Sequence, residues 1–162
     1  MNDHQLEPKE NEPGRNEDVL SGWEFIDNHG RSVADWLRSC LSRAVSAEIC
    51  VAYFTPTGLE VIKDEIEDFL GKGGFLSIIT SEEISKADAR SLLKLAERYP
   101  SVQARVYPAE VTFMHSKVYL LEDGKRTRVL VGSSNLAIGG LRTNIESNLA
   151  GSFHSDHQMV RH

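Results

Sequence analysis

The sequence lacks the features that anchor or cross-link a protein outside the cell. It has two cysteines, and no apolar run reaches the roughly 20 residues that a membrane-spanning helix needs. The N-terminal residues Met1–Gln5 do not begin a secretory signal peptide, which would carry a longer apolar stretch. We therefore expect a cytoplasmic protein that does not bind membranes, with Cys40 and Cys50 as buried free thiols.

Negative charge is concentrated at the N-terminus. Residues 1–18 hold six acidic against two basic side chains and almost no large apolar residue. Such a segment cannot bury enough surface to offset its ordering entropy, so we predict a disordered acidic tail. Residues 19–162 are near neutral, at a formal −2, and are apolar enough for one domain. This balance argues against a large generic nucleic-acid-binding surface but permits a local basic cleft for phosphates.

The spacing of apolar residues predicts alternating helices and strands. Helical spacing covers residues 32–45, 59–70 and 81–99, and strand-type runs cover residues 48–54, 75–80 and 102–106. This alternation favours crossover connections and parallel strands. Beyond Pro108 the pattern changes to strands at 111–121 and 128–131, joined through Asp123-Gly124, and a last strand within 145–153. The predicted fold is α/β, with a mixed, largely parallel sheet sandwiched by helices.

One short run points to chemistry. His115 and Lys117 are two residues apart on a predicted strand, so their side chains project from the same face. If Asp123-Gly124 forms a two-residue turn, His115 lies opposite Gly132, and Ser133 and Asn135 can aim donors at an oxyanion there. A nucleophile beside a fixed cation is suited to phosphate esters.

Simpler interpretations compete with this one. A lone strand histidine is usually structural, and serine and asparagine after a strand are often turn formers. A strand glutamate such as Glu146 is commonly just exposed, although it could accept from the second nitrogen of His115 and fix its tautomer. The run from His154 to His157 resembles a metal site, but lies where a chain end frays, so we expect no metal and no cofactor.

Three linked motifs follow one another in the second half of the sequence: His115-x-Lys117, then Gly132-Ser133-x-Asn135, then Gly140-Leu141 with Asn144-x-Glu146. Together they resemble the signature of the phospholipase D superfamily. The match spans about residues 112–150, and residues 52–59 also resemble the first strand-to-helix turn of its nuclease-like branch. That branch includes small bacterial endonucleases, metal-independent restriction endonuclease domains and helicase-linked domains.

The resemblance implies a metal-independent phosphodiesterase with a phosphohistidine intermediate. Lys117 and Asn135 would hold the non-bridging phosphate oxygens with help from Ser133, and Glu146 would orient His115. The scheme needs two His-x-Lys copies and this sequence has one. It therefore implies a homodimer with the site on the twofold axis, or a second copy in a missing remainder.

The expected substrate is nucleic acid, with DNA ahead of RNA, and a fused or associated helicase or ATPase domain is an expected partner. The chain ends where a covering helix would be expected to begin, which favours a partner over the last strand or a domain cut from a longer protein. Two alternatives remain open. The first is a non-catalytic nucleic-acid-binding or regulatory module. The second, a phospholipid hydrolase or transferase, ranks last because the sequence offers no amphipathic membrane helix.

Overall fold

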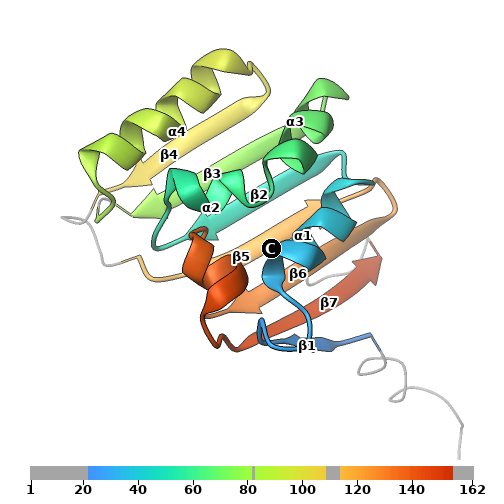
Figure 1. Cartoon of the computed structure of the whole chain (residues 1–162). Helices are drawn as coiled ribbons and strands as arrows, with labels where there is room; N and C mark the ends of the chain where they lie inside the picture. The colour runs from blue at the N-terminus through green and yellow to red at the C-terminus, as the bar shows by residue number, and fades with distance from the viewer. Residues whose placement is uncertain (1–21, 82, 109–113, 155–162) are drawn as a thin grey trace, which may run out of the picture.

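The strands of the part of the chain that the structure describes form one seven-stranded sheet in the order β1-β7-β6-β5-β2-β3-β4. Figure 1 shows the computed structural model, which describes residues 22–81, 83–108 and 114–154. The expected acidic tail, residues 1–18, lies outside the described residues. The elements, in chain order, are β1 (Glu24–Ile26), α1 (Val33–Leu41), β2 (Ser46–Val51), α2 (Pro56–Glu60), α3 (Lys63–Gly71), β3 (Phe75–Ser81), α4 (Lys86–Arg98), β4 (Val102–Tyr107), β5 (Lys117–Glu122), β6 (Arg126–Gly132), η1 (Gly139–Thr143) and β7 (Asn148–His154).

Strand direction changes where the connections shorten. The pairs β2/β3 and β3/β4 are parallel, because the helices α2, α3 and α4 carry the chain back between these strands. The pairs β2/β5, β5/β6, β6/β7 and β1/β7 are antiparallel. The mixed α/β class is confirmed, but the parallel share is smaller than expected, since β5, β6 and β7 follow one another without crossovers.

The helices cover one face of the sheet among the described residues (Figure 1). Every second side chain of the central strands is buried beneath them, as with Ile49, Ile78 and Tyr119. We expected helices on both faces of the sheet, but the described residues place helices on one face only. On the other face, Phe25, Leu149 and Val131 are neighbours across three strands and stay substantially exposed.

The predicted first helix is confirmed as α1. The Ser32 Oγ accepts a hydrogen bond of 3.0 Å from the Asp35 N–H, which caps the helix as the sequence indicates. The single helix expected over residues 59–70 is instead two helices, α2 and α3. They are separated because Ile62, which is fully buried, takes φ −125° and ψ 27°, outside the helical region.

The hairpin of β5 and β6 forms, but two residues out of the expected register. Glu122 pairs with Thr127, so the next position beyond Val118–Val131 sets Lys117 opposite Gly132. The cause is a longer loop, in which the Asp123 carboxylate accepts from the N–H groups of Lys125 (3.0 Å) and Arg126 (2.8 Å). A shift of two keeps the same side chains on the same face, so the predicted site is preserved.

No helix in residues 22–81, 83–108 and 114–154 has both the length and the apolar character that a membrane crossing requires.

Candidate functional site at the end of the central strands

The residues predicted to carry the chemistry lie at one edge of the sheet, where β2 and β6 end and β5 and β7 begin (Figure 1). Lys117 pairs with Val51 in the β5/β2 ladder, and the ladder continues with an Ala52 N–H to Ser116 carbonyl bond of 2.9 Å. Gly132 pairs with Asn148 across β6 and β7. The loops that carry the remaining predicted residues therefore leave the sheet at this same edge.

His115 and Lys117 are in direct contact. The Lys117 Nζ lies 2.8 Å from the His115 Nδ1, 3.0 Å from its Nε2 and 3.0 Å from its carbonyl oxygen. Lys117 is 7% exposed, whereas His115 is exposed to solvent. An accessible imidazole thus sits against a largely buried ammonium group, which is the juxtaposition predicted from their spacing of two.

The electrostatics of Lys117 reflect two opposed influences. Burial lowers the pKa of Lys117 below its ordinary value, because it removes water from the charged form. The negative charge of Glu146 acts in the other direction and raises the pKa. Burial is the larger influence, so the pKa of Lys117 stays below its ordinary value, and the charge of Glu146 offsets part of that shift.

Asn135 is anchored at one end of its amide. Its Oδ1 accepts a hydrogen bond of 2.9 Å from the Tyr53 N–H, just beyond the end of β2. The neighbouring Leu136 carbonyl accepts from the Thr55 N–H at 3.0 Å, which fixes the same loop to the start of α2. The bond from Tyr53 uses the amide oxygen, and the NH₂ group of Asn135 is the donor that can bind an anionic oxygen at this edge.

Glu146 is held by neighbours other than His115. The Ser133 hydroxyl donates to the Glu146 Oε2, and the Asn144 Nδ2 donates to its Oε1 at 3.4 Å. The Ser133 Oγ itself accepts from the Ser147 N–H at 2.9 Å. A serine has one hydroxyl proton, so in this arrangement Ser133 positions Glu146 and has no proton left for a phosphate. The contact of Glu146 with His115 stays a prediction.

A buried polar network supports this edge, and its residues occupy no specified position of the motifs described above. Asn148 is 1% exposed; its Nδ2 donates to the Ile26 carbonyl and the Ser134 Oγ, both at 3.0 Å. Its Oδ1 accepts from the Ser134 N–H at 3.2 Å, and the Tyr119 hydroxyl donates to the Ser134 carbonyl at 3.0 Å. A polar residue at an inward-facing position of a strand is a signal that could have identified Asn148.

Asn28 also supports the site, although it belongs to no recognisable sequence motif. It adopts φ 68°, and its Nδ2 donates to the Gly140 carbonyl at 2.9 Å and the Asn144 carbonyl at 3.1 Å. Its Oδ1 accepts from the Val33 N–H at 2.8 Å, which ties η1 to the start of α1. Gly140 packs so tightly that a Cβ there would lie 2.7 Å from the Asn135 nitrogen. The short π-helix η1, which contains Gly140, therefore packs closely against the Asn135 loop.

No group of three or more His, Cys, Asp or Glu side chains in the described ranges is arranged to hold a metal ion. Of the run from His154 to His157, only His154 lies within those ranges. The arrangement at the edge instead offers an imidazole, a buried cation and an amide donor. Together these groups suit the attack on a phosphate ester and the binding of its oxygens.

The sequence matches the model of one protein family. Residues 37–160 match the family described as cardiolipin synthase, PLD-like domain. No curated protein matches the chain with significance.

Solved structures with the same fold include two of the chain's own size. NucT from Helicobacter pylori has a TM-score of 0.61 at 19% identity, over 86% of this chain and 88% of that one. Nuc from Salmonella typhimurium, a phospholipase D family member, has a TM-score of 0.61 at 15% identity, over 82% of each chain. Phosphatidylserine synthase from Haemophilus influenzae Rd KW20 has a TM-score of 0.65 at 16% identity, over 86% of this chain but 36% of that one.

Proposed function

This chain belongs to the phospholipase D superfamily, and we propose that it is a metal-independent phosphodiesterase that hydrolyses nucleic acid, with DNA as the expected substrate. The observation that carries the proposal is the contact of the Lys117 ammonium with both ring nitrogens of His115. A nucleophile that can attack phosphorus lies beside a cation that can bind the phosphate oxygens, so these two roles need no metal ion. The similarity to Nuc and NucT, which the chain matches over most of their length, supports a nuclease-type substrate.

The proposed reaction has two steps that share one site. His115 attacks phosphorus with the lone pair of a ring nitrogen, so that a P–N bond forms as the P–O bond to the leaving group breaks. A second imidazolium gives its proton to the leaving oxygen. The same imidazole then takes a proton from water, whose oxygen attacks phosphorus and breaks the P–N bond.

The second imidazole is the reason for proposing a homodimer. The sequence holds one His-x-Lys copy, and the mechanism uses two. In a twofold-symmetric dimer the partner's His115 supplies the acid, and either copy can supply the nucleophile. The exposure of His115 at the sheet edge supports this arrangement, because a second copy can approach it.

Lys117 and Asn135 are the proposed binding groups for the non-bridging oxygens. Both are held in place before substrate arrives, Lys117 by its contacts with His115 and Asn135 by the Tyr53 N–H. Donors fixed in advance stabilise developing negative charge without reorganising during the reaction. Ser133 would join them only if its proton left Glu146, so its proposed role at the phosphate is secondary to positioning that carboxylate.

Glu146 is proposed to orient His115 and to balance the positive charge of the site. Its carboxylate already interacts with Lys117 electrostatically. A carboxylate that accepts from one imidazole nitrogen would leave the other free to attack phosphorus.

The test is hydrolysis in EDTA of a simple phosphodiester and of single- and double-stranded DNA. We expect wild type to cleave, His115→Ala to lose cleavage and His29→Ala, an exposed histidine outside the site, to retain it. Sedimentation or light scattering on the same samples measures the oligomeric state. Undiminished cleavage by His115→Ala contradicts the proposal. A folded dimer that binds DNA without cleaving it points to the non-catalytic module.

A phospholipid substrate is the second candidate, favoured by the family's description as cardiolipin synthase and by the fold shared with a phosphatidylserine synthase. The chemistry at phosphorus is the same. Vesicles of phosphatidylglycerol assayed beside DNA separate the two, since each substrate class gives its own product. Release of glycerol or headgroup from vesicles, with no cleavage of DNA, would replace the nuclease proposal with the lipid one.

A further inference from the structure

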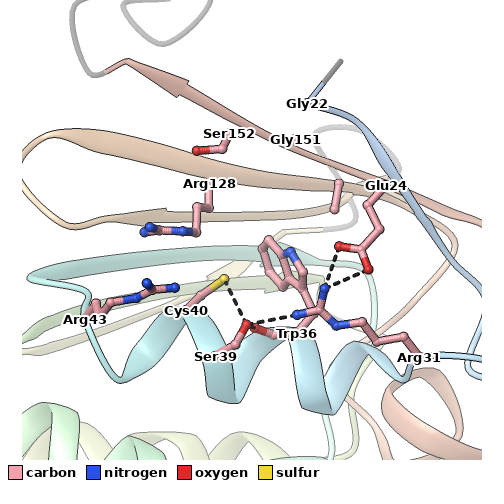
Figure 2. A pocket seen from close by; sticks show the side chains of 11 residues that line it. Gly22, Glu24, Arg31, Trp36, Ser39, Cys40, Arg43, Arg128, Gly151 and Ser152 are labelled. Carbon is pink, nitrogen blue, oxygen red and sulfur yellow. Dashed lines mark hydrogen bonds and ion pairs between the residues drawn. The ribbon is translucent and has the colours of Figure 1, made fainter. Parts of the chain in front are cut away.

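A second positively charged site lies away from the catalytic edge. A cavity of about 210 Å³ opens between α1 and the strands β6 and β7, and Arg31, Arg43 and Arg128 line it. Figure 2 shows these side chains around Cys40, with Trp36 as one wall. Arg128 precedes Gly132 by four residues on β6, which sets it about 13 Å along the strand from the catalytic edge.

Two of the three guanidinium groups are fixed by carboxylates. The Arg31 Nη1 donates to both Glu24 oxygens, at 2.7 and 2.6 Å, and its Nη2 donates to the Ser39 Oγ at 3.1 Å. The Arg128 Nη1 lies 2.8 Å from an Asp123 oxygen, within ion-pair distance, but it is buried and has no hydrogen-bond partner among the described residues. Each pair holds its arginine in place while the remaining N–H groups can face the cavity.

The third guanidinium leaves the cavity with excess positive charge. Arg43 makes no ion pair with a carboxylate of the described residues and is exposed. Arg128 is partly desolvated, since 15% of its side chain is exposed. A cation removed from water interacts more strongly with an anion than an exposed one does.

The positive charges of all three arginines influence the pKa of the Cys40 thiol. Burial raises the pKa of Cys40, and the hydrogen bond from Ser39 and the charges of Arg128, Arg31 and Arg43 each act to lower it. Three guanidinium charges that act on one sulfur atom converge on one small space.

We propose that this cavity binds a phosphate-type oxyanion, independently of the catalytic edge. Guanidinium groups match phosphate oxygens with paired N–H donors, and an anion between Arg43 and Arg128 supplies the charge that the cavity lacks. The volume limits the ligand, because pockets for drug-sized molecules are typically larger than about 300 Å³. A free phosphate or one phosphate of a nucleic acid fits this limit, whereas an entire nucleotide does not.

The test uses the two tryptophans of the chain as local probes. Inorganic phosphate is titrated at constant ionic strength into full-length ¹⁵N-labelled protein, and the indole N–H resonance of Trp36 is assigned with a Trp23→Phe variant. We expect a saturable shift of the Trp36 resonance. Arg43→Gln should raise the half-saturating phosphate concentration about tenfold or more, as loss of a charge-assisted hydrogen bond implies. Arg90→Gln, an exposed arginine on α4, should leave it unchanged.

A dinucleoside monophosphate without a terminal phosphate forms the second arm of the titration. If it shifts Trp36 at lower concentration than inorganic phosphate, the source of the ligand is a nucleic-acid backbone; the reverse order indicates free phosphate. Phosphate that binds only at the catalytic edge leaves the Trp36 resonance unmoved and overturns the proposal. So does a half-saturating concentration that is the same in Arg43→Gln and wild type. Neither result bears on catalysis by His115.

Discussion

Lys117→Met should separate catalysis from stability at a single residue. The Lys117 side chain is almost entirely buried, and its ammonium contacts the ring and the carbonyl oxygen of His115. Methionine has a similar length and no charge, so the substitution removes the buried cation without opening a large cavity. The proposed role of Lys117 predicts that kcat falls by about 100- to 1,000-fold, the usual effect of removing one donor to a developing oxyanion.

The free energy of unfolding should change little or rise. The substitution loses charge-assisted hydrogen bonds that contribute about 1.5–3 kcal/mol each. It also relieves the desolvation of a buried ion, which costs several kcal/mol. Because the two effects have opposite signs, we expect Lys117→Met to lie within about 1 kcal/mol of wild type near neutral pH, or to be more stable.

The lowered pKa of Lys117 also determines how the free energy of unfolding changes with pH. Burial sets the pKa of Lys117 in the folded protein below its ordinary 10.5. The desolvation penalty is therefore fully present below the folded pKa and is relieved as the pH rises from that value to 10.5. Over this window wild type should gain stability relative to Lys117→Met.

The assay is urea unfolding followed by tryptophan fluorescence, at pH values from neutral to about 10.5, with kcat measured on the same preparations. Lys72→Met, an exposed lysine paired with Asp68, is the control and should leave kcat unchanged. Retained activity in Lys117→Met refutes the catalytic role. A loss of stability above about 3 kcal/mol would make Lys117 a structural residue instead.

Three further predictions concern the stability of the fold. Asn148→Ala leaves buried partners unpaired, so the free energy of unfolding should fall by about 2–4 kcal/mol in urea titrations; a change near zero contradicts the network. Gly140→Ala places a Cβ against the Asn135 backbone and should lower both Tm and kcat, whereas Gly71→Ala meets nothing within 4 Å and should raise Tm. The pKa of Asp123 is lowered from 3.8 to about 2, first by the backbone N–H groups of its loop and then by Arg128. The contribution of Asp123 to the stability of the fold is therefore present above pH 3.8 and is lost as the pH falls toward 2. Asp123→Asn should show a smaller loss of Tm over that range.

Short-range signals in the sequence predicted most elements. Ser32 and the apolar spacing after it located α1, because a cap and a helical stripe depend only on near neighbours. The register of β5 and β6 was wrong by two because Asp123 binds the backbone of its own loop, which a count of turn residues does not reveal. The break between α2 and α3 comes from the burial of Ile62, a tertiary effect.

The contacts of the site are likewise of two kinds, those that a short-range pattern predicts and those that depend on the tertiary structure. A spacing of two on one predicted strand placed His115 and Lys117 together. In the structure β5 begins at Lys117 and His115 precedes the strand, and the two side chains are nevertheless in contact. The support from Asn28 and Asn148 could not be predicted in this way, since each joins segments more than 100 residues apart in sequence. The partners of Glu146 also depend on how a loop folds back: its carboxylate accepts from Ser133 and Asn144, two contacts that the motif spacing does not predict, and its contact with His115 stays a prediction.

The central claim is that His115 forms a covalent bond to phosphorus in the absence of a metal ion. It is tested most directly by rapid quenching of wild type with a DNA substrate in EDTA, followed by intact-mass and peptide mass spectrometry. We expect a transient nucleotide adduct on His115 that is stable in base, labile in acid and absent from His115→Ala. Turnover in EDTA by a protein with alanine at this position, or an adduct on any other residue, would contradict it.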